Sequence, residues 1–168
     1  LGTLLAIFCI FYRSIFSLFT EQRKLFWQVC LGTLPLFPLV LAIKPIKELF
    51  NQPEYLGFFF LITAFLIWCG IQFGKAKVKD RPWRDPLVIG LFQAIAIMPG
   101  VSRSGSTTAA ARLLGWSYNE ALRFSFLLAI PAILGGIAIE LLQLFLKAES
   151  ALPQVGFAPY AAGFVTSF

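Results

Sequence analysis

The sequence predicts an all-α, polytopic integral membrane protein. Of its 168 residues, 58% are hydrophobic and 13% are charged, and the mean hydropathy is +0.80. A soluble globular domain is roughly half apolar and about a quarter charged, so this composition disfavours an ordinary water-soluble enzyme. The apolar residues are grouped into long runs, and most charged residues stand between the runs. That distribution is typical of helices that cross a bilayer.

Five apolar runs predict transmembrane helices within a single membrane domain, 1–168. A helix needs about 20 residues to cross the ~30 Å of hydrocarbon in a bilayer. The loop 74–85 carries five Lys or Arg residues, and an excess of positive charge in a short loop predicts the cytoplasmic side. The predicted spans are 1–19, 25–43, 55–73, 121–146 and 155–168, the last of them truncated.

The segment 87–114 departs from this pattern. Two apolar pieces, each too short to span a membrane, flank the polar run Pro99-Gly-Val-Ser-Arg-Ser-Gly-Ser-Thr-Thr108. Irregular backbone at membrane depth is tolerated where protein or a water-filled cavity satisfies it. We therefore predict a re-entrant helical hairpin with its tip near mid-membrane. One long kinked helix is the rival interpretation, and the breaker pair Pro99-Gly100 disfavours it.

The polar run is the candidate site. Hydroxyl residues that precede a helix cap it and leave free N–H groups for an anion, while Gly100 and Gly105 let the backbone approach a ligand closely. Arg103 offers a planar fork that matches phosphate oxygens. An arginine at membrane depth is costly and marks a functional site. The alternative is a capped helix start with a snorkelling arginine.

Other site chemistries find little support in the chain. The sequence has no His, and its three cysteines are isolated within apolar runs. The polar run lacks the Gly-Lys-Ser/Thr of a nucleotide-binding P-loop, and no basic stripe with stacking aromatics predicts nucleic-acid binding. It also contains no acid that could act as a base or hold a metal ion, so we expect no metal ligand here. Gln93 is either an interhelical hydrogen-bonding residue or a contact in the polar cavity.

The run Pro99–Thr107 resembles the motif of the undecaprenyl-diphosphate phosphatase family, the bacitracin-resistance phosphatases of bacteria. The stretch 90–99 is similar to the family's approach to this motif, and Glu120-Ala-Leu-Arg-Phe-Ser-Phe-Leu-Leu-Ala-Ile-Pro131 is similar to the span after it. The resemblance implies an inverted-repeat fold with two re-entrant hairpins. It also implies that the chain is a fragment, without the family's N-terminal motif of glutamates, serines and a histidine and without its C-terminal spans.

The resemblance implies a multi-pass hydrolase of the bacterial plasma membrane, with an outward-facing site. It would convert undecaprenyl diphosphate to undecaprenyl phosphate and inorganic phosphate, which recycles the lipid carrier for peptidoglycan synthesis and confers bacitracin resistance. We predict Arg103, Ser102 and Ser104 as catalytic residues. The predicted substrate-binding residues are Gly100, Gly105, Thr107 and Gln93.

Several expectations stay open on the sequence alone. A divalent metal, Mg²⁺ or Ca²⁺, is compatible with the resemblance, and its ligands are expected outside this chain. The expected partners are a polyprenyl diphosphate lipid and the membrane, with no nucleic acid and an undetermined oligomeric state. The alternatives to hydrolysis are a transporter or flippase for an anionic lipid headgroup, or a fragment without activity.

Overall fold

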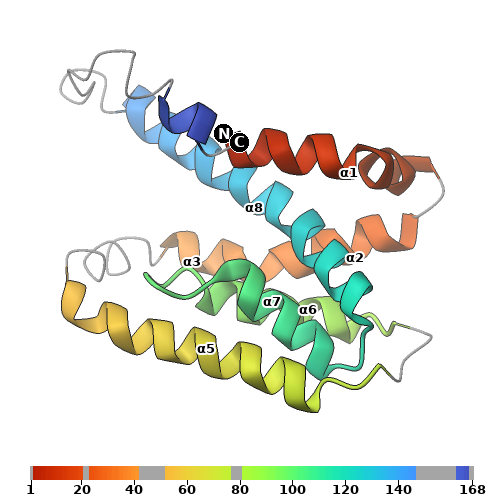
Figure 1. The fold of residues 1–168 in the computed structure, drawn as a ribbon. Coiled ribbons are helices and arrows are strands. Elements are labelled where there is room, and N and C mark those ends of the chain that lie inside the picture. Colours follow the sequence, from red (N-terminus) through yellow and green to blue (C-terminus); the bar gives the residue numbers. More distant parts are fainter. Residues whose placement is uncertain (1, 21–22, 42–51, 77–80, 147–161, 167–168) are drawn as a thin grey trace.

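The computed structural model describes residues 2–20, 23–41, 52–76, 81–146 and 162–166, and these residues form an all-helical fold (Figure 1). The all-α prediction is therefore confirmed for the described part of the chain. Residues 162–166 form a short helical segment. The other elements are, in order, α1 (Gly2–Thr20), α2 (Arg23–Thr33), η1 (Leu34–Leu36), α3 (Phe37–Leu41), η2 (Pro53–Tyr55), α5 (Leu56–Phe73), α6 (Arg84–Ile95), α7 (Arg103–Leu113) and α8 (Tyr118–Leu146).

Two of the described helical segments, Pro53–Phe73 and Tyr118–Leu142, are long and apolar enough to cross a membrane. Only 11% and 17% of their apolar windows are buried inside the protein. A core helix of a soluble protein would hide most of its apolar surface, whereas these two expose it. The outer surface of the fold is accordingly suited to lipid.

Some predicted spans correspond to one helix of the structure, and one is interrupted. The run 1–19 corresponds to α1, but the run 25–43 is interrupted after Thr33 by the 3₁₀ turn η1, which contains Pro35. Proline lacks an N–H and cannot continue the α-helical hydrogen-bond pattern there. Residues 42–43 of the predicted span 25–43, and residues 155–161 and 167–168 of the predicted span 155–168, lie outside the described residues.

Two short helices, α6 and α7, replace a continuous helix in the region of the polar run. α6 ends at Ile95 and α7 begins at Arg103. Local turns satisfy several N–H groups of the break, including Val101 N–H to the Met98 carbonyl at 3.1 Å. The rival interpretation, one long kinked helix, is therefore wrong. The two helices are antiparallel, because the start of α6 meets the turn after α7. In this contact the indole Nε1 of Trp116, three residues beyond the end of α7, donates to Asp85 Oδ2 at 2.9 Å.

Small residues allow these short helices to pack very closely on their neighbours. A Cβ on Gly70 of α5 would lie 2.8 Å from the Ala109 Cα of α7. A Cβ on Gly90 of α6 would lie 2.2 Å from the Gly32 carbonyl oxygen of α2. Real Cβ atoms do not approach backbone so closely, so these glycines set the distance between the helices. Close helix crossings at small residues are typical of membrane proteins.

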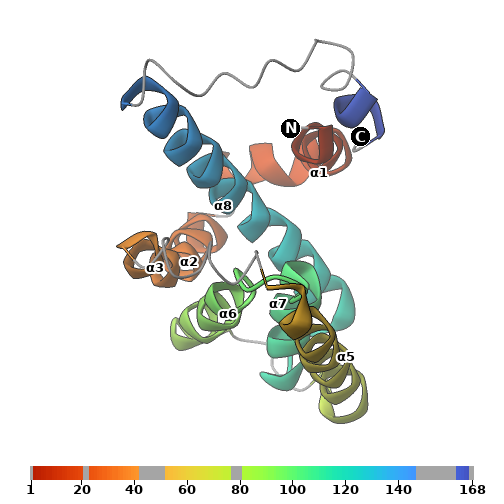
Figure 2. The same cartoon turned by 90° about the vertical axis from the view of Figure 1, so that its left-hand side faces the viewer.

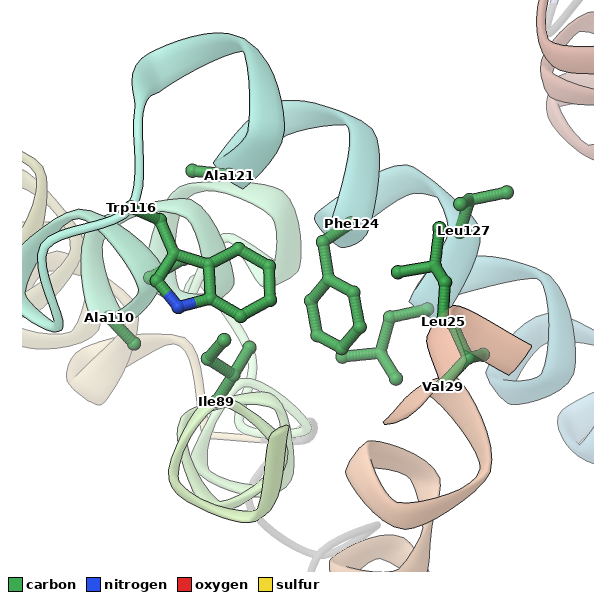
Figure 3. Close-up of a cluster of buried hydrophobic side chains, with 10 residues drawn as sticks. Leu25, Val29, Ile89, Ala110, Trp116, Ala121, Phe124 and Leu127 are labelled. Carbon is green, nitrogen blue, oxygen red and sulfur yellow. The ribbon is translucent and has the colours of Figure 1, made fainter. Parts of the chain in front are cut away.

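A buried cluster joins α2, α6, α7 and α8 (Figure 3). The Trp116 indole packs against the Phe124 ring, with centroids 5.0 Å apart, and Ile89 of α6 lies beside the indole (Figure 3). α8 runs obliquely past the short helices toward α1 (Figures 1 and 2). The ring of Phe126 on α8 packs on Phe11 of α1, with centroids 5.4 Å apart. α8 and α2 thus both connect α1 to the short helices.

Polar contacts close the hairpin at the end away from the break, which we call the base. Gly115, at φ +88°, ends α7 in the left-handed conformation, and the N–H of Trp116 donates to the Ala111 carbonyl at 3.0 Å. This is a Schellman ending. Arg81 forms an ion pair with Glu120 and lies 4.5 Å above the Trp116 ring. Together with the Asp85–Trp116 bond, these contacts fix the ends of α6, α7 and the start of α8 to one another.

The close α5–α7 contact predicts the effect of Gly70→Ala. The added methyl group meets the Ala109 backbone, which cannot rotate away, so we expect a loss of about 1–3 kcal/mol in the free energy of unfolding. Thermal unfolding of the purified protein in detergent measures it. Gly57→Ala on the same helix is the matched control, because nothing lies within 4 Å of a Cβ at Gly57. Equal melting temperatures for the two variants would contradict this packing.

Candidate functional site

Ser102 caps the N-terminus of α7. Its backbone is extended, and its Oγ accepts a hydrogen bond from the Gly105 N–H at 3.2 Å. The Ser102 carbonyl accepts from the Ser106 N–H at 2.9 Å. The first N–H groups of a helix have no partner within it, and those of Arg103 and Ser104 point out of the helix end. A helix N-terminus of this kind favours an anion.

Gly100 turns the chain before this cap. It adopts φ +88°, a conformation that L side chains rarely adopt. A Cβ at this position would also lie 3.1 Å from the Leu56 carbonyl oxygen and 3.2 Å from the Phe59 Cβ. Gly100 therefore serves both the turn and the close approach of the break to α5. The structure places it beside the α7 N-terminus, as the predicted site requires.

Thr63 of α5 holds the break in place. Its hydroxyl lies 3.2 Å from the carbonyl oxygens of both Phe59 and Gly100, to which it can donate, and it accepts from the Ser102 N–H at 3.0 Å. Sequence reasoning missed this residue. The available signal was that Thr63 is the one Ser or Thr in the apolar run 55–73. A lone hydroxyl in a membrane helix often bonds to a neighbouring element.

Arg103 is the first residue of α7 and is partly buried. Within the described residues its guanidinium makes neither an ion pair nor a hydrogen bond, in contrast to Arg81 and Arg112. A partly buried positive charge without an acidic partner is costly, and an anionic ligand would offset that cost. The open amides of the same helix end would act on the same ligand.

Ser104 and Gly105 complete the first turn of α7. Ser104 is exposed, so its hydroxyl is accessible to a ligand at the helix end. A Cβ on Gly105 would lie 3.0 Å from the Ile67 Cδ1 and 3.1 Å from the Ser102 Oγ. Gly105 therefore lets α7 approach α5 without displacing the Ser102 cap. The structure brings the predicted residues Gly100, Ser102, Arg103, Ser104 and Gly105 together at one helix end.

Thr107 lies deeper in the protein than the sequence analysis implied. Its side chain is 1% exposed. The hydroxyl donates to the Arg103 carbonyl at 2.9 Å and lies 2.6 Å from the Ser125 Oγ of α8. Its hydrogen-bonding capacity is used between α7 and α8, and its predicted contact with substrate stays a prediction. Ser125 was missed by sequence reasoning, although it stands within the Phe-Ser-Phe run of α8.

Gln93 is completely buried on α6, one turn after Ile89. Within the described residues, neither its Oε1 nor its Nε2 has a hydrogen-bond partner, and the same holds for the Ser106 Oγ. The expected interhelical hydrogen bond is therefore not formed among these residues. Buried polar atoms without partners are costly. They leave unsatisfied polar groups inside α6 and α7.

The described residues supply positive charge and hydrogen-bond donors to this site, and none of their carboxylates forms an ion pair with Arg103. Asp85 and Glu120 are at the base of the hairpin, where they bind Trp116 and Arg81. Across the described ranges, no three side chains of His, Cys, Asp or Glu come together to hold a metal ion. Hydroxyl and guanidinium groups are a poor ligand set for Mg²⁺ or Ca²⁺. The geometry can bind and neutralise an anion, and among the described residues no carboxylate is paired with the guanidinium at this helix end.

A family profile described as "Bacitracin resistance protein BacA" matches residues 1–168. The chain is similar to proteins named undecaprenyl-diphosphatase, with 52% identity over 169 residues in Protochlamydia amoebophila, 35% over 206 in Erythrobacter litoralis and 37% over 186 in Gloeobacter violaceus. These alignments cover 100%, 98% and 99% of the chain. They cover 65%, 72% and 63% of the relatives, so the chain spans about two thirds of their length.

The bridging role of Thr63 predicts the effect of Thr63→Val. The substitution keeps the shape but leaves the Ser102 N–H and the Gly100 carbonyl without this partner, which should cost about 1–3 kcal/mol. Denaturant unfolding in detergent measures the loss. Thr33→Val is the control, because the Thr33 hydroxyl bonds only to the Val29 carbonyl of its own helix at 2.8 Å. Similar losses in both variants would show that the bridge adds nothing to stability.

Proposed function

Because the chain belongs to the bacitracin resistance protein BacA family, we propose that it carries part of the active site of an undecaprenyl-diphosphate phosphatase. The reaction hydrolyses the phosphoanhydride bond of undecaprenyl diphosphate and yields undecaprenyl phosphate and inorganic phosphate. The printed names of its relatives support this activity. Recycling of the lipid carrier for cell-wall synthesis and resistance to bacitracin are the roles that follow. The name undecaprenyl-diphosphatase describes a hydrolase, so we propose hydrolysis in preference to transport of a lipid headgroup.

One observation carries the assignment of the site. Arg103 stands at the N-terminus of α7, where its guanidinium has no partner among the described residues and the first helical amides are open. Phosphoryl transfer depends largely on positioning and on neutralising charge at the phosphate oxygens. Arg103 would clamp the diphosphate through its planar fork, and the amides and the Ser104 hydroxyl would donate hydrogen bonds to it.

The other residues of the site act through the backbone. Ser102 caps α7 and so directs the helix end at the ligand, while Gly100 and Gly105 allow the break and α7 to approach α5. Attack on the terminal phosphorus also requires a base that accepts a proton from water. We propose that groups outside the described residues supply this base. A divalent metal used in the reaction would also be held by groups outside the described residues.

We also propose that α6 and α7 lie in the membrane as a re-entrant hairpin. The break would then lie near mid-membrane and the base at the cytoplasmic surface, with the site reached from outside a bacterial plasma membrane. The Lys- and Arg-rich loop before α6 and the lipid-suited surfaces of α5 and α8 support this placement. An inverted repeat, with a second hairpin that contributes acids to the same site, completes the proposal.

Arg103→Ala tests the assignment. We expect the substitution to lower phosphate release from undecaprenyl diphosphate by about 10²–10³-fold, the loss typical of removing one transition-state donor. The protein is produced from its full coding sequence, purified in detergent and assayed for inorganic phosphate.

Arg84→Ala is the matched control, because the Arg84 side chain is 84% exposed at the start of α6, far along the helix from the break. If Arg103→Ala keeps more than about a tenth of the unsubstituted turnover, Arg103 does not clamp the diphosphate in the transition state. If the melting temperature falls in Arg103→Ala but not in Arg84→Ala, the lost activity is due to impaired folding. Arg103→Lys then keeps the charge without the planar fork and separates the two contributions.

A further inference from the structure

A groove of about 390 Å³ runs along α7 on the side that faces α5 and α8. With about 3.6 residues per turn, Ser104, Thr108 and Arg112 recur on one face of α7, and Arg103 and Ser106 fall on the opposite side. The groove therefore shares Ser104 and Gly105 with the start of α7 and runs from there toward the base, along the face opposite Arg103. Its apolar walls and floor come from Ile67 and Ile71 of α5, Ala109 of α7, and Leu122 and Phe126 of α8.

The two ends of the groove differ in chemistry. The end near the break is formed by small residues, Ser104 and Gly105. The end at the base carries Arg112 and Tyr118, of which Tyr118 is 58% exposed. An aromatic residue and a cation at one end of an apolar groove are typical of a membrane–water interface. The groove thus has a cationic end at the base, an apolar middle and an end of small residues near the break.

Arg112 has an unneutralised charge at the polar end. Its Nη1 donates to the Trp116 carbonyl at 2.9 Å and its Nη2 to the Gly74 carbonyl. Among the described residues no carboxylate pairs with it, whereas Arg81 and Arg84 each have one. A guanidinium has five N–H donors, so donors remain after both carbonyl bonds. An anionic group at this end would therefore meet an available cation.

The length of the groove fits one leaflet of a bilayer. From Ser104 to Arg112 the helix rises by about 12 Å. Half of the ~30 Å hydrocarbon thickness is about 15 Å. If the base lies at the cytoplasmic surface, which rests on the membrane placement proposed above, the groove extends from that surface toward the middle of the membrane. This is the path of a single acyl chain.

We propose that this groove binds one acyl chain of an anionic phospholipid of the cytoplasmic leaflet, with the lipid phosphate at Arg112 and Tyr118. The apolar walls hold the chain, and the charge of Arg112 selects the headgroup. The headgroup end at Arg112 lies at the opposite end of α7 from Arg103, and the chain end of the groove adjoins the substrate site at Ser104 and Gly105. The bound lipid would fill the space between α5 and α8 and so support α7 from its outer side.

Native mass spectrometry of the purified protein tests the proposal with two probes, phosphatidylglycerol and phosphatidylcholine of identical acyl chains. We expect one retained lipid and a preference of about fivefold for phosphatidylglycerol, the factor from one cationic side chain near an anionic lipid. Leu122→Trp fills the groove and should abolish retention. Leu134→Trp, at a half-exposed position of α8 outside the groove, should retain the lipid.

Arg112→Gln tests the headgroup contact. It should retain a lipid but lose the preference for phosphatidylglycerol, and Arg112→Lys should keep it because the charge remains. Equal retention in Leu122→Trp and the unsubstituted protein would overturn the proposal, as would equal retention of the two probes. A retained polyprenyl lipid that Leu122→Trp removes would also overturn it, since the groove would then hold the substrate's tail.

The phosphate-release assay keeps this inference separate from the proposed function. Normal hydrolysis of undecaprenyl diphosphate without lipid retention rejects the groove and leaves the phosphatase intact. Lipid retention without hydrolysis supports the groove and rejects the proposed function.

Discussion

The hydroxyl of Thr63 satisfies two backbone groups that the break between α6 and α7 leaves without helical partners. It accepts from the Ser102 N–H and can donate to the Gly100 carbonyl. Away from water, such groups cost several kcal/mol each when unpaired. A broken helix can therefore exist in this fold because α5 presents a hydroxyl at the height of the break. The cap at Ser102 and the open end of α7 depend on the same contact.

The rest of the hairpin is held by contacts that need small residues or buried pairs. Gly70 brings α5 onto α7, and Gly90 brings α6 onto α2. At the base, Asp85 and Trp116 join the outer ends of the two short helices. Both ends of the hairpin are thus fixed, while the first turn of α7 stays accessible. A site built on a helix end held in this way keeps its donors in one geometry, which anion binding requires.

The two sides of α7 have different chemistry. Arg103 and Ser106 lie on one side, and the apolar groove between α5 and α8 lies on the other. Thr107 and Ser125 bond to each other between α7 and α8. The hydroxyl residues of the motif therefore divide into those that cap or donate at the helix end and those that fix the helix to its neighbours. That division explains why one short motif contains so many of them.

The sequence by itself determined the helical class, the short helices on either side of Pro99-Gly100, and the set of residues at the start of α7. These follow from local properties: hydropathy over a window, the positive φ of a glycine, and capping by Ser102. Tertiary structure decided which hydroxyls are free and which are engaged. Thr63 and Ser125, which bond to this region, are distant in sequence from Arg103. Thr107 and Ser104 are both hydroxyl residues of α7, but Thr107 is buried and Ser104 is exposed. Hydrogen bonds between helices depend on how those helices cross, and no local pattern of residues specifies that crossing.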